Sequence, residues 1–152
     1  LETQGYIHYE ISNWAKPGEE CQHNLVYWRH LPYLGAGVAA HSYLDGHRLA
    51  NTPDVSKYLG DLSSGKLPID QDEEIGPELE VAETVIMGLR LTEVINYHDI
   101  WRTFGIDSLY RYRREIRELL EVGLLESDGS YLRLTRKGRL LGNEVFWRFL
   151  PE

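Results

Sequence analysis

The chain has 152 residues, of which 42% are apolar and 26% are charged, and its formal net charge is −8. This length and composition are typical of a folded domain with its own core, and they exclude a disordered chain. The apolar runs are far shorter than the roughly 20 residues of a transmembrane helix, and the single cysteine, Cys21, excludes an internal disulfide framework and any metal site built from several thiolates of this chain.

The first half of the chain is predicted to contain strands and one short helix. Residues 5–14 alternate in part and are rich in Tyr and Ile, which indicates a strand, and Pro17-Gly18 indicates a turn after it. Residues 34–43 are small and apolar and predict a buried strand. Asp45-Gly46 predicts a two-residue hairpin turn, and residues 53–63 predict a helix with one apolar face. Because the sequence begins with leucine rather than methionine, we expect it to be part of a longer protein.

The composition changes over residues 70–77, where an acidic run ends in Gly76-Pro77. Such a run indicates a connector followed by the start of a helix. We therefore divide the chain into residues 1–76 and residues 77–152.

The second part is predicted to be mainly helical. Apolar spacing and closing glycines indicate helices over residues 77–91, 92–104 and 107–123. A hairpin is predicted with its turn at Asp128-Gly129, a pair compatible with type I′, and Thr135 is the predicted N-cap of a last helix. Three helices, a hairpin and a final helix are the order of a winged-helix domain.

A winged helix first suggests DNA binding, but the charges argue against it. Four arginines lie on the predicted third helix, where a recognition helix would lie: Arg111, Arg113, Arg114 and Arg117. Glutamates are interleaved at helical spacing, so we expect these arginines to be ion-paired on a solvated face. Residues 1–100 carry sixteen acidic and six basic side chains, and an acidic body repels phosphates. We predict no specific nucleic-acid partner.

The six histidines show no spacing typical of a metal site. The densest chemical feature is an aromatic block between Tyr9 and Trp28 that also contains His23 and Tyr27. An imidazole can ligate haem iron, and aromatic rings can cover the face of a porphyrin. The residues alone leave two interpretations open, a surface for a flat ligand and an ordinary aromatic core cluster.

Several separated motifs occur in a fixed order along the chain. They are Tyr9-Glu10-Ile11-Ser12-Asn13-Trp14-Ala15, His23-Asn24-x-x-Tyr27-Trp28, Tyr33-Leu34-Gly35-Ala36-Gly37-Val38-Ala39-Ala40-His41-Ser42-Tyr43, Gly88-Leu89-Arg90-Leu91, Gly123-Leu124-Leu125-Glu126 and Leu134-Thr135-x-x-Gly138-x-x-Leu141-x-Asn143-x-Val145-Phe146. With these motifs the chain resembles the C-terminal part of the HemW-type haem chaperones, which are relatives of oxygen-independent coproporphyrinogen III oxidase in the radical SAM superfamily. The resemblance covers essentially the whole chain.

The resemblance implies an α+β (α/β) fold. Residues 1–76 would complete a radical SAM partial TIM barrel, and residues 77–152 would form a winged-helix-like C-terminal domain. The longer protein would bind a [4Fe–4S] cluster and S-adenosyl-L-methionine (SAM) and lie in the cytoplasm. It would also bind haem and pass it to acceptors such as membrane respiratory proteins. The N-terminal part of the same protein would be a partner of this chain.

The resemblance also assigns roles to individual residues. His23 matches the histidine of the HNxxYW motif and would ligate haem iron, with Asn24, Tyr27 and Trp28 beside it. A glycine-rich segment with Gly35, Gly37 and His41 would lie at the barrel mouth, where related enzymes approach SAM.

Two features depart from the family pattern. The CxxxCxxC cluster motif is missing, so this chain alone is expected to perform no radical chemistry. The second glycine of the family's Gly-x-Gly-Ala-His-Ser pattern is replaced by Ala39. Two alternative functions stay open: a coproporphyrinogen III oxidase, for which the tetrapyrrole is substrate rather than cargo, and, more weakly, a winged-helix DNA-binding regulator.

Overall fold

The computed structural model describes residues 1–105 and 108–151, which form two compact units. One unit comprises Leu1–His30 and Pro77–Glu152, and the other comprises Leu31–Gly76. The sequence boundary at residues 76 and 77 thus coincides with one edge of the second unit, while residues 1–30 pack with the C-terminal part. The assignment of residues 1–76 to a radical SAM barrel stays a prediction.

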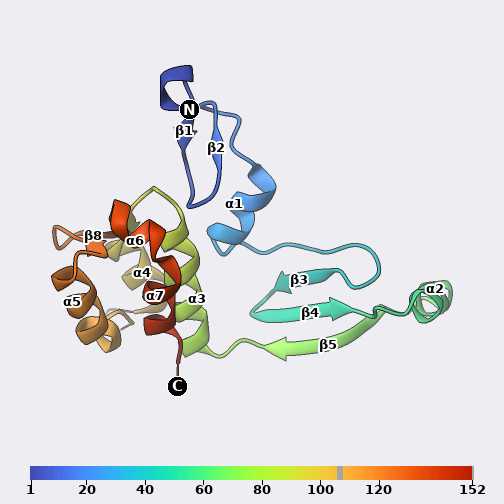
Figure 1. Ribbon diagram of the computed structural model, residues 1–152. Coiled ribbons are helices and arrows are strands. Elements are labelled where there is room, and N and C mark those ends of the chain that lie inside the picture. Colours follow the sequence, from blue (N-terminus) through green and yellow to red (C-terminus); the bar gives the residue numbers. More distant parts are fainter. Residues whose placement is uncertain (106–107, 152) are drawn as a thin grey trace. The chain divides into compact units, whose positions relative to one another are not determined.

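The unit Leu31–Gly76 is a three-stranded antiparallel sheet with one helix. Its strands are β3 (His41–Leu44), β4 (His47–Asn51) and β5 (Ile69–Glu74), in the order β3-β4-β5. Helix α2 (Val55–Ser63) lies beyond the strands, between β4 and β5 in the chain (Figure 1). Asp45 and Gly46 both have positive φ, so the predicted hairpin between β3 and β4 is confirmed.

Two sequence predictions in this unit are wrong. Most of residues 34–43 form an extended loop and not a buried strand, and Leu34 is 77% exposed. The acidic run is not a connector but strand β5, because its carboxylates face basic residues of β4 across the ladder. Arg48 is opposite Glu73, with an ion pair of 3.2 Å, and His47 contacts Asp72 at 2.6 Å.

The first thirty residues form a short hairpin and a helix. After the 3₁₀ turn η1 (Glu2–Gln4), strands β1 (Ile7–His8) and β2 (Trp14–Ala15) pair antiparallel, and α1 (Gln22–Trp28) follows. The predicted single strand over residues 5–14 is wrong, because the chain reverses between His8 and Trp14, whose rings stack 4.4 Å apart. The next segment, residues 24–29, had no clear sequence pattern and belongs mostly to α1.

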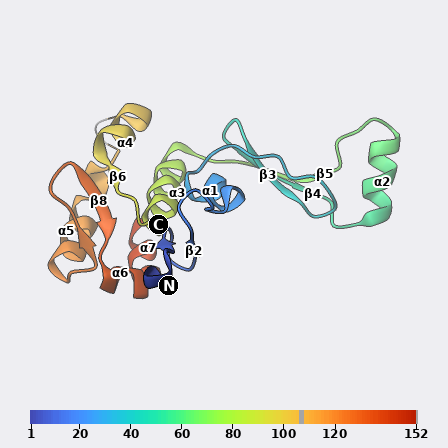
Figure 2. The same ribbon diagram turned by 90° about the horizontal axis from the view of Figure 1, so that it is seen from above.

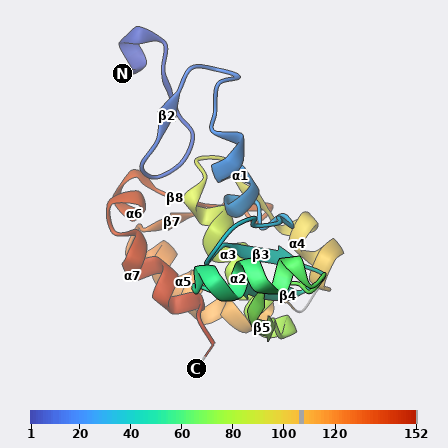
Figure 3. The same cartoon turned by 90° about the vertical axis from the view of Figure 1, so that its right-hand side faces the viewer.

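Helix α3 (Pro77–Arg90) is the centre of the larger core, as its apolar spacing predicts. It packs with a sheet of order β6-β8-β7, made of β6 (Ile95–Asn96), β8 (Tyr131–Leu134) and β7 (Leu125–Glu126). Figure 2 shows α4 (Tyr97–Phe104) and α5 (Arg113–Glu121) at this sheet. The shorter elements are η2 (Tyr110–Tyr112), α6 (Arg136–Leu140), α7 (Gly142–Phe146) and η3 (Trp147–Phe149), and the C-terminal ones are the red segment in Figure 3.

The order of three helices, a hairpin and a further helix is present, with β6 as an additional strand, but several bounds differ from the predictions. Residues 92–96 are not helical. The third predicted helix, over residues 107–123, corresponds to η2 and α5, and its predicted first residue, Asp107, lies outside the described residues. The predicted last helix is divided at Leu141 into α6 and α7. The turn at Asp128-Gly129 is not type I′, because only Gly129 has positive φ. Thr135 is confirmed as an N-cap, since its hydroxyl accepts a hydrogen bond of 3.0 Å from the Gly138 amide.

Candidate functional site

The predicted haem-binding residues lie on helix α1, which divides them between two faces. His23 is exposed, and its Nε2 lies 3.1 Å from the hydroxyl of Tyr27, one turn later. The two rings meet edge to face, with centroids 4.9 Å apart. The four-residue spacing therefore brings His23 and Tyr27 together, as expected for a helix.

Trp28 faces the protein interior instead. Its ring packs against a small core of Tyr9, Ala15, Leu25 and Leu91, and the guanidinium carbon of Arg90 lies 4.3 Å from the ring centre. Its indole N–H is buried and has no hydrogen-bond partner among the described residues. Trp28 cannot cover a flat ligand at His23 in this arrangement. The partly buried Asn24 side chain makes no hydrogen bond to a described residue.

The donor chemistry at His23 fits an axial ligand of haem. Nδ1 has no partner among the described residues, and Nε2 contacts only the Tyr27 hydroxyl. A neutral imidazole has one nitrogen that can bind iron, and the second carries the proton. If Tyr27 donates to Nε2, the proton lies on Nδ1, and iron binding at Nε2 displaces that phenol.

The other three predicted residues, Gly35, Gly37 and His41, belong to the unit Leu31–Gly76. A Cβ atom at Gly35 would lie 2.1 Å from the carbonyl oxygen of His41, so only glycine fits there. The amide of Gly35 donates to Ser42 Oγ at 3.0 Å. The amide of Gly37 donates to the Tyr58 hydroxyl at 3.1 Å. At Gly35 the close approach is therefore made by the chain itself, whereas Gly37 has open space around it and a φ of +111°, and both amides already donate hydrogen bonds.

A buried ion pair connects three motifs that lie far apart in the sequence. Glu10 is completely buried, and its Oε2 lies 3.9 Å from Nη2 of Arg90. Backbone pairing holds them together, because the Ile11 amide donates to the Arg90 carbonyl at 3.0 Å. Arg90 then covers the ring of Trp28. Glu10 Oε2 and Arg90 Nε have no hydrogen-bond partner among the described residues.

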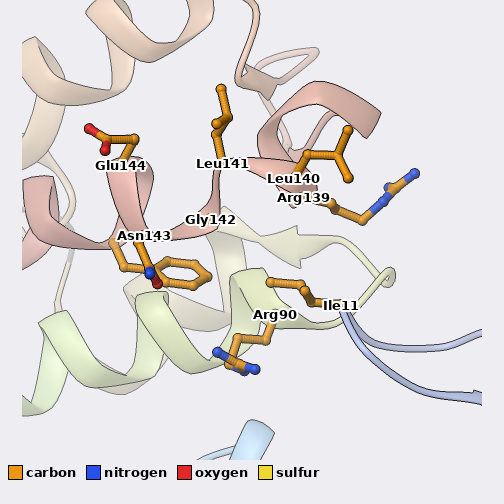
Figure 4. Close-up of a pocket in the computed structure, with 9 residues that line it drawn as sticks. Ile11, Arg90, Arg139, Leu140, Leu141, Gly142, Asn143 and Glu144 are labelled. Carbon is orange, nitrogen blue, oxygen red and sulfur yellow. The ribbon is translucent and has the colours of Figure 1, made fainter.

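Beside this pair lies an open cavity of about 390 Å³, shown in Figure 4. Arg90 reaches it from the end of α3, Ile11 from the loop after β1, and Arg139 from α6. The remaining wall comes from α7, which includes Asn143, and from Leu140 and Leu141 before it. The guanidinium groups of Arg90 and Arg139 point in different directions, so they do not form one anion site (Figure 4).

The residue patterns did not single out Glu10 and Arg90 as a pair. The only sequence signal was a charged residue between two apolar neighbours: Glu10 follows Tyr9 and precedes Ile11, and Arg90 lies between Leu89 and Leu91. A buried charge needs a partner, so such a position predicts an ion pair without naming the partner.

The described residues contain neither a group of potential metal ligands nor a helix that could cross a membrane. Within residues 1–105 and 108–151, no group of three or more His, Cys, Asp or Glu side chains could hold a metal ion. In the same part of the chain, no helix combines the length and the apolar character needed to cross a membrane.

The chain is similar to known proteins in its sequence and in its fold. Residues 77–141 match the family described as HemN C-terminal domain. "Heme chaperone HemW" of Bacillus subtilis (strain 168) is 36% identical over 100% of this chain and 40% of the relative. The protein of the same name from Lactococcus lactis is 34% identical over 99% of this chain and 39% of the relative. The chain thus spans about two fifths of the length of these relatives.

The fold is similar to a solved structure entitled "Coproporphyrinogen III oxidase (HemN) from Escherichia coli is a Radical SAM enzyme." The TM-score is 0.75 with 19% sequence identity, over 98% of this chain and 38% of the other. This match shows the fold, and the sequence matches extend over the whole chain. Residues 77–141 therefore contain a HemN C-terminal domain, and the whole chain is similar to the HemW-type haem chaperones.

Proposed function

We propose that this chain is the C-terminal part of a haem chaperone that binds haem through His23 and delivers it to acceptor proteins. The observation that supports this most directly is the exposed His23 imidazole, paired with Tyr27, in a chain similar throughout to proteins named haem chaperones. The proposal also takes membrane respiratory proteins as the acceptors and the cytoplasm as the location.

The cluster and SAM belong to the longer protein in this proposal. Cys21 is the only cysteine, whereas a [4Fe–4S] cluster needs several thiolates, so this chain does not fit the cluster as its sole holder. The amides of Gly35 and Gly37 are occupied by Ser42 and Tyr58, and SAM binding there would involve other atoms of the loop. When bound, the two groups would supply the radical chemistry typical of the superfamily.

The N-terminal part of the same protein is the proposed partner of helix α2. The apolar face that the sequence predicts on α2 is not covered by the unit Leu31–Gly76 to which the helix belongs, since Val55, Leu59 and Leu62 are 59%, 57% and 47% exposed. Leu67, shortly after the helix, is 77% exposed. Apolar side chains gathered in this way are typical of a surface that another segment covers, and the relatives have more than half of their length outside the matched region.

The test is haem binding by the full-length protein with His23→Ala. Loss of an axial imidazole is expected to shift the Soret band and weaken ferric haem binding, with the fold retained because His23 is exposed. His98→Ala is the matched control, since His98 is also an exposed histidine near the start of a helix. An unchanged spectrum and affinity in His23→Ala would exclude His23 as the ligand, and His41 would then be tested.

A second measurement separates cargo from substrate. The same preparation is assayed for turnover of coproporphyrinogen III with SAM. Turnover without a stable haem complex would contradict the chaperone proposal in favour of the oxidase.

A further inference from the structure

A second aromatic surface lies in the HemN C-terminal domain, away from the motifs discussed above. Helices α4 and α5 and the turn η2 enclose an open groove of about 540 Å³. Tyr97 and Trp101 from α4 form one wall, with ring centroids 6.0 Å apart and planes inclined by 16°. Tyr110 from η2 is a third ring at the groove. Its volume lies within the range of about 300–1,000 Å³ typical of small-ligand sites.

The inner surface of the groove is apolar and partly exposed. Ile116 and Leu120 lie one turn apart on α5, and Leu109 is buried behind them. Trp101 is 39% exposed and Leu120 is 36% exposed, so the described chain does not cover them. A flat apolar ligand that enters here gains contact with aromatic faces and aliphatic side chains.

Two cations line the same groove. Arg113 lies over the ring of Tyr110, with its guanidinium carbon 4.2 Å from the ring centre, and Arg117 follows one turn later. Neither forms an ion pair with a described carboxylate. Their neighbours differ: Arg111 pairs with Glu78 and Arg114 with Glu118, both at 2.9 Å. The prediction that all four arginines of the predicted third helix are ion-paired is therefore wrong for Arg113 and Arg117, which line the groove.

We propose that this groove binds a planar tetrapyrrole dicarboxylate. The aromatic and aliphatic walls would contact the macrocycle, and Arg113 and Arg117 would each pair with one propionate. This inference rests on the proposed function for the identity of the ligand, but it places the ligand at residues that differ from the His23 site.

The groove should not require iron. Its described lining contains no imidazole, thiol or thioether, and the phenol of Tyr97 already contacts Ser127 Oγ at 3.2 Å. Binding is therefore governed by the macrocycle and its carboxylates. An iron-free porphyrin is the probe that distinguishes this groove from an iron ligand at His23.

The experiment titrates iron-free protoporphyrin IX into the full chain and follows quenching of tryptophan fluorescence. Arg113→Ala and Arg117→Ala are each expected to weaken binding about tenfold, the effect of one charge-assisted pair. Arg114→Ala is the matched control, because Arg114 lies on the same helix, is 81% exposed and pairs with Glu118. His23→Ala is expected to bind the iron-free porphyrin as the unchanged chain does.

The porphyrin dimethyl ester tests the same contacts without changing the protein. Because it lacks both carboxylates, it is expected to bind about a hundredfold more weakly than the diacid, the product of the two single tenfold effects. Equal binding of ester and diacid, or unchanged affinity in both arginine variants, would overturn the proposal. So would loss of iron-free porphyrin binding in His23→Ala. None of these results bears on whether His23 ligates ferric haem, which the Soret measurement decides separately.

Discussion

Replacement of Arg90 by alanine is expected to destabilise the unit of residues 1–30 and 77–152 by about 3 kcal/mol. The ion pair that it removes is long, since Arg90 Nη2 lies 3.9 Å from Glu10 Oε2, but the Glu10 side chain is completely buried. Removing one partner of a buried pair costs about 3–5 kcal/mol, because the remaining charge is left uncompensated. The lower end applies here, since the Arg90 side chain is itself 26% exposed.

Arg111→Ala is the matched control. Arg111 lies closer to its partner, 2.9 Å from Glu78, but the two side chains are 40% and 63% exposed. An exposed pair contributes only about 0–1 kcal/mol, so the shorter ion pair is expected to matter less. The burial of Glu10, rather than the distance between the charged atoms, therefore decides which substitution lowers the free energy of unfolding more.

The measurement is urea-induced unfolding followed by tryptophan fluorescence, together with thermal melting. A loss of about 3 kcal/mol corresponds to a decrease in Tm of about 6–12 °C for a chain of this size. Glu10→Gln removes the buried charge and keeps an acceptor for the Ser12 amide, which now donates to Oε1 at 2.7 Å. In that background Arg90→Ala is expected to cost at least about 1 kcal/mol less.

The reasoning would be refuted if Arg90→Ala and Arg111→Ala destabilised the chain equally. It would also be refuted if the cost of Arg90→Ala were the same with Glu10 and with Gln at that position. The second result would assign the whole effect to the contact of Arg90 with the ring of Trp28.

Three further predictions concern single positions. Ala39→Gly is expected to stabilise the chain by about 0.5–1 kcal/mol in urea unfolding, because Ala39 has φ of +57°; Ala36→Gly, where φ is not positive, should not stabilise it. Gly138→Ala is expected to cost about 3 kcal/mol or more by the same measurement, because the added Cβ would lie 2.0 Å from the Leu124 carbonyl oxygen, and a normal Tm would contradict this. The hydrogen bond to Asp72 raises the pKa of His47 above 6.5. The stability that this pair contributes is therefore fully present below about pH 6.5 and is lost as the pH rises through the raised pKa. An NMR titration in which Asp72→Asn leaves the pKa of His47 unchanged would exclude the hydrogen bond as the cause.

Local patterns predicted the elements whose causes are local. The apolar spacing of α3, the Asp45-Gly46 turn and the Thr135 cap each depend on a few neighbouring residues, and each is present in the structure. The four-residue spacing of His23 and Tyr27 puts them on one face of a helix, but the sequence did not predict the helix α1 that carries them.

Elements that depend on distant partners were not predictable in this way. The acidic run of β5 has no apolar alternation and becomes a strand because β4 supplies facing cations. Residues 34–43 have strand-like composition, but their glycines are used in a folded loop whose amides are bonded by Ser42 and Tyr58. The pairing of Glu10 with Arg90 spans eighty residues and follows from a backbone bridge between Glu10 and Leu91.

The direction of Trp28 limits what the His23 site can bind. Because Trp28 packs under Arg90, the His23 site offers an iron-binding nitrogen and one edge-on phenol, with little apolar cover for a macrocycle. The groove of α4 and α5 has the opposite properties, with apolar walls and two cations for carboxylates but no imidazole or thiol among its described lining residues. Iron is therefore the variable that separates the two proposed sites: its removal from the ligand would abolish the reason for binding at His23 and would leave every contact proposed for the groove intact.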